Sequence, residues 1–318
     1  MKTAFRWMLV SLALIGTASL MKAQDAEVTH NTWTSGAPLP TAVWGPSAAV
    51  VKKEIYVVGG DNANGTILAD VQVYNPATDT WSASVSLPTP LYVTSAAVVK
   101  NVLYVFGGYN GETAVNTVWA YSTKTKTWTA MTDMPTARYQ STAVVEKNIV
   151  YVIGGDDTSG NYVATVESYN PATNSWTEEA PMLETKLSPA AGLAGTTIVA
   201  ADGAVAPGEI TGDTEGYDAA TNTWTELAAD PTARAFSCFG SVGSKFYDAG
   251  GYLNNAGAAT TLNAAFQLSK NKWTTTLAPM PQGTMIGASA VYKGQLYCIG
   301  GWATWKGTPI SNVQIYQP

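Results

Sequence analysis

Two columns of residues recur along the 318-residue chain with side chains suited to binding a ligand. Arg138, Lys186 and Arg234 follow one another at intervals of 48 residues, and such cations form charge-assisted hydrogen bonds with carboxylates. Aromatic residues recur close by, and their flat rings are the rigid anchors of many recognition surfaces. These aromatic candidates are Trp44, Tyr92, Tyr109, Tyr139, Tyr252, Trp302 and Trp305. Together the residues predict a shallow binding site for a carboxylate-bearing ligand or an acidic peptide.

The composition argues against several other kinds of chemistry. His30 is the only histidine, which nearly excludes histidine metal sites, Ser/His/Asp triads and Cys/His nucleophiles. The chain has 17 Lys and Arg against 23 Asp and Glu, with no block of cations, so we expect no nucleic-acid partner. Glycine pairs follow strands and lead into no helix, which removes a nucleotide-binding loop. We therefore expect no metal site and no cofactor, and we assign no catalytic residue.

A repeat of 47 to 49 residues organises these positions. Each unit predicts four short strands, of which the second ends in a glycine pair such as Gly59-Gly60 and the fourth carries a tryptophan. Turns such as NPATD join the third strand to the fourth. The tryptophans are Trp33, Trp81, Trp128, Trp176, Trp224 and Trp273, and the aromatics of the third strands are Tyr74, Tyr121, Tyr169, Tyr217, Phe266 and Tyr316. We expect both columns to be scaffold that packs between units.

Units of this kind predict an all-β propeller of four-stranded antiparallel blades. The glycine pair, the spaced Tyr and Trp, and a Leu-Pro or Met-Pro before the next first strand resemble the kelch repeat over residues 31–318. Those dipeptides are Leu39-Pro40, Leu87-Pro88, Met134-Pro135 and Met280-Pro281. The resemblance implies six blades. The last unit lacks a fourth strand, and the N-terminal NTWTSGAPLP supplies one, so we expect the N-terminal strand to complete the last blade and close the ring.

The resemblance also implies where the candidate residues lie. In kelch propellers that bind peptides or proteins, the loop after the glycine pair and the loop before the first strand share one face around the axial channel. The three cations and seven aromatics belong to these loops, so we expect one ligand site there. The structural alternative is that the cations pair with Glu184, Asp156 or Asp202 and that the aromatics cap the channel.

Three features depart from the repeat. Asp248 in FYDAGG replaces an apolar residue, and a buried acid must be paired or protonated. We expect a structural partner such as a backbone amide or Lys245, with a catalytic acid as the alternative. Cys238 and Cys298 predict two buried free thiols, with a bridge between neighbouring strands as the alternative. The fourth unit reads IVAADG without its glycine pair, which predicts a degenerate or less rigid blade.

The N-terminus predicts export. Lys2 and Arg6 precede an apolar run over residues 7–20 and small or polar residues up to Gln24, the order of a secretory signal. We expect a signal peptide over residues 1–23 and one propeller domain over residues 24–318, secreted or periplasmic, with no membrane span.

We expect a non-enzymatic module that binds a protein, peptide or glycan through its loop face, including an anionic ligand. The alternative is a cofactor-free sugar mutarotase or epimerase, because the family includes a periplasmic sialic-acid mutarotase with six blades. Ring opening needs a placed acid and base, for which Arg138, Glu184, Asp156 or Asp248 are the candidates. Galactose oxidases of the same family bind copper through two histidines, which a chain with one histidine does not provide.

Overall fold

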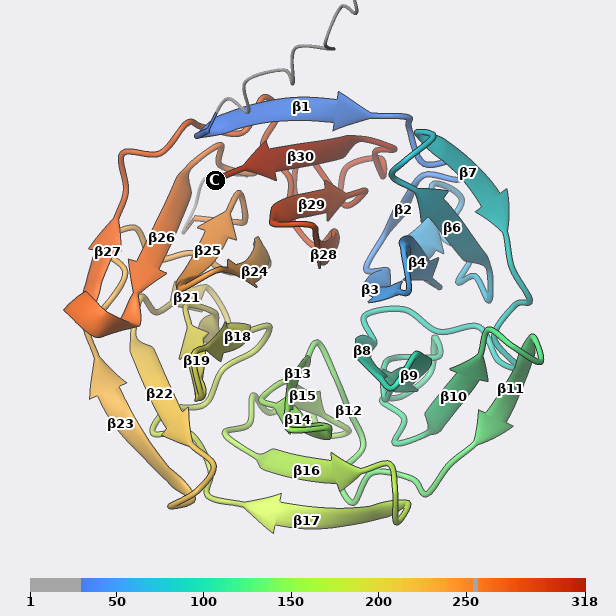
Figure 1. Ribbon diagram of the computed structural model, residues 1–318, viewed down its shortest axis with the longest axis horizontal. Coiled ribbons are helices and arrows are strands. Elements are labelled where there is room, and N and C mark those ends of the chain that lie inside the picture. Colours follow the sequence, from blue (N-terminus) through green and yellow to red (C-terminus); the bar gives the residue numbers. More distant parts are fainter. Residues whose placement is uncertain (1–29, 254–256) are drawn as a thin grey trace, which may run out of the picture.

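Six four-stranded antiparallel sheets surround a central axis (Figure 1) in the computed structural model, which describes residues 30–253 and 257–318. The predicted six-bladed all-β propeller is therefore confirmed. Blade 1 consists of β3 (Ser47–Val51), β4 (Glu54–Val58), β6 (Val71–Asn75) and β7 (Thr80–Ala83). Blade 2 consists of β8 (Ser95–Val99), β9 (Val102–Phe106), β10 (Val118–Ser122) and β11 (Thr127–Ala130). Blade 3 consists of β13 (Thr142–Glu146), β14 (Ile149–Ile153), β16 (Val166–Asn170) and β17 (Ser175–Glu179).

Blades 4 to 6 repeat the same order from the axis outward. Blade 4 consists of β18 (Ala190–Ala194), β19 (Thr197–Ala201), β22 (Thr214–Asp218) and β23 (Thr223–Leu227). Blade 5 consists of β24 (Cys238–Val242), β25 (Lys245–Ala249), β26 (Asn263–Gln267) and β27 (Lys272–Thr274). Blade 6 consists of β28 (Ala288–Tyr292), β29 (Gln295–Ile299), β30 (Val313–Gln317) and β1 (Thr32–Gly36). A short 3-10 helix, η1 (Leu268–Lys270), joins β26 to β27.

The composition of each strand suits its distance from the axis. The innermost strands have small residues such as SAAVV, because six of them converge around the channel. The second strands, such as β4 and β9, are apolar on both faces, because each face packs against a neighbouring blade. Six clusters of buried side chains fill the six boundaries between adjacent blades, so the core of the molecule is a ring of inter-blade cores.

The tryptophan column links each blade to the one before it. The indole Nε1 of Trp81 donates to the Ala37 carbonyl at 2.8 Å, and that of Trp176 donates to the Thr132 carbonyl at 2.9 Å. Each of these tryptophans packs on the tyrosine of its own blade, with ring centroids 5.0 Å apart. The scaffold role predicted for both columns is therefore confirmed.

The N-terminal strand closes the ring as predicted. β1 pairs antiparallel with β30, so that Trp33 lies opposite Tyr316 in the outermost position of blade 6 (Figure 1). Trp33 Nε1 donates to the Ala278 carbonyl at 2.8 Å, which repeats the inter-blade bond of the other tryptophans. Closure thus removes the free edge that β30 would present.

The prediction of two free thiols was wrong, and the alternative of a bridge was right. Cys238 in β24 and Cys298 in β29 form a disulfide with their Cα atoms 5.6 Å apart. The small residues at these positions face each other across the boundary between blades 5 and 6, which brings the two sulfur atoms together.

The predicted signal peptide over residues 1–23 lies outside the described residues. Within residues 30–253 and 257–318, no helix has the length and apolar character needed to cross a bilayer.

Candidate functional site

Six pairs of loop residues surround one end of the axial channel, and we call this end the aromatic mouth. In every blade, the loop before the innermost strand pairs with the loop after the second strand. Two of these contacts are short ladders, β2 (Val43–Trp44) with β5 (Asp61–Asn62) and β12 (Arg138–Tyr139) with β15 (Asp156–Asp157). The six facing pairs are Trp44 and Asp61, Tyr92 and Tyr109, Tyr139 and Asp156, Leu187 and Ala204, Ala235 and Tyr252, and Met285 and Trp302.

The pairing brings all seven predicted aromatic residues into one continuous series of ring contacts, which we call the aromatic arc. Trp44 stacks on Trp302 with ring centroids 4.2 Å apart and meets Tyr92 edge-on at 4.9 Å. The series continues through Tyr92 and Tyr109 to Tyr139 on one side. On the other side it passes from Trp302 to Trp305 and Tyr252. The seven aromatic residues therefore lie together at the mouth; that they bind a ligand stays a prediction.

The arc is open at blade 4. The pair in that blade is Leu187 and Ala204, which has no ring. Here the loop after the second strand forms its own hairpin, β20 (Ala204–Ala206) with β21 (Glu209–Ile210). The degenerate fourth unit seen in the sequence is thus the gap in the arc.

Polar groups without partners lie among the rings. The hydroxyl of Tyr139 donates to Asp156 Oδ2 at 2.7 Å. Among the described residues, Asp156 Oδ1, Asp61 Oδ1 and the indole Nε1 of Trp302 have no hydrogen-bond partner. Burial raises the pKa of both Asp61 and Asp156, and hydrogen bonds from Trp44 and Tyr139 oppose this effect. Buried polar atoms normally have partners, so the mouth has capacity for a hydroxyl-bearing ligand.

A channel with a volume of about 380 Å³ runs between the six innermost strands. Its lining consists of apolar side chains, including Phe236 and Phe239, and of hydroxyl side chains, with Gln140 as the only amide, and none of the described lining residues is charged. The convergence of a carboxylate and an arginine that would favour a sugar-converting enzyme does not occur in the channel.

A ring of backbone hydrogen bonds surrounds the channel just below the arc. The residue after the first member of each facing pair has a positive φ, including the bulky Val93 at 49° and Phe236 at 62°. Val93 N donates to the Gly45 carbonyl at 2.6 Å, and Ser188 N donates to the Gln140 carbonyl at 2.8 Å. Five such bonds join successive blades, and within the described residues the link from Phe236 to Ser188 is the missing one. The backbone under the arc is therefore fixed, except between blades 4 and 5.

The predicted role of the three cations was wrong, because their charged groups do not reach the mouth. Arg138 is fully buried and turns inward between strands, where Nη2 lies 2.9 Å from Glu167 Oε2 and 3.1 Å from the Val152 carbonyl. Burial lowers the pKa of Arg138 to about 10, against the opposing effect of Glu167, and the guanidinium stays charged at neutral pH. Such buried pairs hold the fold and leave no cation for a ligand.

Lys186 and Arg234 are buried in the same way in the next two blades. Lys186 Nζ donates to the Asp213 carbonyl at 2.9 Å and lies 3.3 Å from Glu215 and 3.9 Å from Glu184. Arg234 Nη2 lies 3.1 Å from Asp230 Oδ2. The alternative prediction, that the three cations form internal ion pairs, was right. Of the partners it named, only Glu184 and Asp202 lie beside a cation.

Glu167 and Glu215 were missed because they lie on a different strand from the loop of their cation, and Asp230, four residues before Arg234 in the same loop, was missed as well. In blades 3 and 4 the acid belongs to the third strand, where Glu167 faces Val152 and Glu215 faces Ala200. In blade 5 the equivalent third-strand residue is Ala264, and the facing residue is Asp248. A carboxylate thus stays in the pair but changes strand. The sequence does contain a signal for these pairs. Blades 3 to 5 have an acid in this strand pair and a cation before the first strand, whereas blades 1 and 6 have neutral Gln72 and Gln314 and no such cation.

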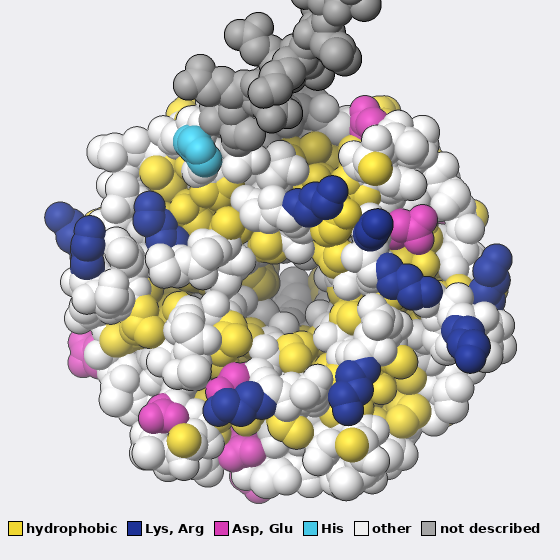
Figure 2. Space-filling model, in the orientation of Figure 1, with side chains coloured by type: hydrophobic (Ala, Val, Ile, Leu, Met, Phe, Trp, Pro, Cys, Tyr) yellow, Lys and Arg dark blue, Asp and Glu magenta, His cyan; other side chains and the backbone are white. Residues whose placement is uncertain are grey.

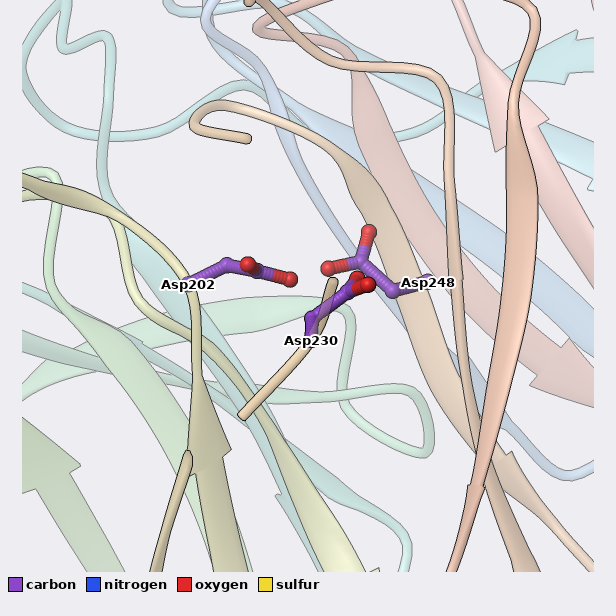
Figure 3. Close-up of side chains that lie close together, drawn as sticks. All are labelled: Asp202, Asp230 and Asp248. Atoms are coloured by element: carbon purple, nitrogen blue, oxygen red, sulfur yellow. The ribbon is translucent and has the colours of Figure 1, made fainter. Parts of the chain in front are cut away.

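Asp248 belongs to a buried cluster with Asp202 and Asp230, whose carboxylate oxygens lie within 4.8 Å of one another (Figure 3). Figure 3 shows the side chains of Asp202 and Asp248 pointing toward each other. Burial raises the pKa of Asp202 well above its ordinary value, with the charge of Asp248 adding to the effect, and burial also raises the pKa of Asp248. The charge of Arg234 opposes the effect of burial and lowers the pKa of both carboxyls. The charged neighbours of Asp248 are therefore Asp202, Asp230 and Arg234, and the expected partner Lys245 is exposed.

Comparison with known proteins agrees with this architecture. The family model described as the KLHDC2/KLHL20/DRC7 Kelch-repeats domain matches residues 20–206. The chain is similar to the solved structure titled "Structure of YjhT", with a TM-score of 0.77 and 19% sequence identity, over 87% of this chain and 95% of that chain. At this identity the likeness concerns the fold. A search among curated proteins found no match.

Proposed function

This chain belongs to the kelch-repeat family, and from that premise we propose that it is an exported binding module that takes a neutral glycan chain at its aromatic mouth. The observation that carries the proposal is the aromatic arc, in which seven rings from five blades follow one another around the channel. Successive sugar units present flat faces of C–H groups that pack on such rings, while their hydroxyls donate to and accept from polar groups.

The charges at the mouth favour a neutral ligand. Asp61 and Asp156 lie beside the arc, at the aromatic mouth. Each has one carboxylate oxygen without a hydrogen-bond partner, which is free to accept from a sugar hydroxyl. The three cations expected to attract a carboxylate are buried in internal pairs. Lys306, beside Trp305, is the only exposed cation among the described loop residues of the mouth, against Asp61, Asp156 and Asp157. An anionic ligand would therefore meet more negative than positive charge, and we propose a neutral ligand in place of the anionic one.

The disulfide supports export. Bridges of this kind persist in oxidising compartments and are rare in the cytosol. The bond between Cys238 and Cys298 therefore agrees with the secreted or periplasmic location expected from residues 1–23.

The test is calorimetric titration with neutral oligosaccharides of glucose, mannose and N-acetylglucosamine. Tyr109→Ala and Trp305→Ala remove one ring from each side of the arc, and Trp305 is 41% exposed, so its loss should not disturb the core. We expect each change to weaken binding by about tenfold or more, the usual effect of losing an aromatic anchor. Tyr292→Ala, at the opposite end of the propeller, is the control. Unchanged affinity in both arc variants would refute the proposal.

A sugar mutarotase is the second candidate, and one observation favours it. Asp156 has a raised pKa and accepts a hydrogen bond from the Tyr139 hydroxyl, which places two proton-transfer groups side by side at the mouth. Measurement of anomer exchange by NMR on any sugar that binds distinguishes the two functions. Exchange faster than in water and lost in Asp156→Asn would establish the enzyme, whereas binding with no acceleration would establish the binding module.

A further inference from the structure

The end of the propeller opposite the aromatic mouth gathers most of the lysines, and we call it the lysine face. It consists of the turns that join the first strand to the second in all six blades and the third strand to the fourth in blades 1 to 5, together with the strand residues that flank these turns. Figure 2 shows blue side chains distributed around the opening of the channel on one face. The ten exposed lysines in these turns are Lys52, Lys53, Lys100, Lys124, Lys126, Lys147, Lys245, Lys270, Lys272 and Lys293.

Charge is separated along the propeller axis. The turns of the lysine face contain four acids, Glu54, Asp79, Glu146 and Asp218, against the ten lysines. The rest of the described chain has four cations, Arg138, Lys186, Arg234 and Lys306, against seventeen Asp and Glu. The sequence conceals this separation because the lysines are dispersed along the chain, and the repeat brings them onto one face of an acidic protein.

Four of these lysines occupy an unfavourable backbone conformation. Lys52, Lys100, Lys147 and Lys293 each begin the turn between the first and second strand with a φ between 48° and 58°. Such turns prefer Gly, Asn or Asp, and blades 4 and 5 have Gly195 and Gly243 at this position. The positive φ opposes a lysine at these four positions, and each of these lysines nevertheless places a cation in the turn after an innermost strand.

We infer that the lysine face binds an acidic polysaccharide, a flexible chain with repeated carboxylate or sulfate groups. Its cations are all lysines, which act as point charges and lack the planar fork with which arginine holds phosphate or stacks on bases, so a nucleic acid fits less well. The large apolar side chains exposed in the described residues are Val85, Leu183 and Trp305, none of which lies in these turns. The face therefore has no apolar anchor for a bilayer.

Dispersed lysines suit a polymer better than a compact anion. Lys52, Lys100, Lys147 and Lys293 belong to four different blades, so a single small carboxylate meets only one of these turns and gains little in water. A long anionic chain lies across several blades and releases counterions at every contact, which makes binding strong at low salt and steeply salt-dependent.

The test uses the full-length exported protein and immobilised polygalacturonate, with dextran as the uncharged polymer. In the test variant, Lys52, Lys100, Lys147 and Lys293 are all replaced by asparagine. Asparagine accepts the left-handed conformation, so we expect the variant to keep or raise its melting temperature while binding weakens by at least tenfold and the salt dependence becomes shallower. The matched control is Lys306→Asn, which removes a lysine with a φ of 55° from the other end and should bind like the original protein.

Duplex DNA, vesicles containing phosphatidylglycerol and polyglutamate complete the design. Binding to polygalacturonate that is lost in the fourfold variant supports the inference. Unchanged binding in that variant, no binding at low salt, or preference for DNA, vesicles or polyglutamate over polygalacturonate overturns it. Because Tyr109→Ala leaves the lysine face intact, failure of the aromatic site would not affect this result.

Discussion

Asp202 occupies a backbone position that the other five blades give to glycine. Its φ is 57°, and the equivalent glycines have φ values between 57° and 71°. A Cβ at Gly59 would lie 2.1 Å from the Leu91 carbonyl oxygen, so a side chain at this position is difficult to accommodate in a standard blade. Asp202 is also fully buried beside Asp248, Asp230 and Arg234. Conformation, burial and charge all oppose this aspartate, so replacing it should stabilise the protein.

Asp202→Asn should stabilise the protein increasingly as the pH rises. The raised pKa of Asp202, caused first by burial, means that the folded state keeps a proton that the unfolded chain releases above about 3.9. Folding stability therefore falls with rising pH, by about 1.4 kcal/mol per pH unit, until the folded carboxyl also ionises. Asparagine removes this loss and donates an amide hydrogen to Asp248. Thermal unfolding of both proteins from acid to neutral pH should show a growing advantage for the variant.

The exposed Asp133→Asn is the control for this measurement, and it should leave the pH profile of the melting temperature unchanged. A constant difference between Asp202→Asn and the original protein at every pH would contradict a raised pKa of Asp202 in the folded state.

At the same scale, side-chain direction limited what could be predicted. The aromatic residues were found together as expected, because bulky rings on adjacent loops of one mouth contact one another wherever each one points. Arg138 and Arg234 start from the same loops, but their long side chains reach inward to carbonyl groups between strands. A loop position gives the starting point of a side chain and not its end, so equal spacing of cations did not distinguish a ligand site from internal pairs.

At the scale of elements, one disulfide links two neighbouring blades in addition to the backbone. The disulfide connects β24 of blade 5 to β29 of blade 6, and the cysteines are 60 residues apart in the sequence. Replacing both with alanine frees this loop in the unfolded chain, which the chain-entropy model values at about 4 kcal/mol. We expect a loss of about 2–4 kcal/mol in the free energy of unfolding, measured by urea denaturation.

Dithiothreitol provides the matched comparison. It should lower the stability of the original protein by a similar amount and have no effect on the Cys238→Ala, Cys298→Ala protein. Equal denaturation curves for the original protein with and without dithiothreitol would show that the bridge does not contribute. The sequence could not decide the bridge, since two cysteines in different repeats become neighbours only when adjacent blades pack.

At the scale of the whole molecule, closure was predictable because counting strands required it. Six innermost strands and five complete blades leave one strand missing, and the N-terminal tryptophan segment matches it. The boundary between blades 4 and 5 was not predictable in this way. There the ring of backbone hydrogen bonds is interrupted, and the Asp202, Asp230 and Asp248 cluster is buried. Both features come from residues of single units that differ from the repeat, so the repeat pattern does not predict them.

The closing strand is held to blade 6 without covalent connection, so its loss should affect the whole ring. Deleting residues 31–38 removes β1, the Trp33 bond to Ala278 and the hydrogen bond between Asn31 and Tyr316, and it exposes the edge of β30. The boundaries of blade 6 with both neighbours then open together. We expect the melting temperature to fall by at least about 10 °C, which corresponds to a few kcal/mol for a chain of this size.

A pair of equivalent tryptophans separates closure from simple loss of packing. Trp33→Ala and Trp128→Ala delete the same side chain from the same column, and each indole donates to a carbonyl of the neighbouring blade. The strand of Trp128 stays attached to its blade through the turn from β10, whereas the strand of Trp33 is attached by pairing alone to β30. Loss of Trp33 therefore loosens a strand that only non-covalent contacts retain, and Trp33→Ala should lower the melting temperature more than Trp128→Ala. Equal shifts for the two variants would mean that the ring is stable without its closure.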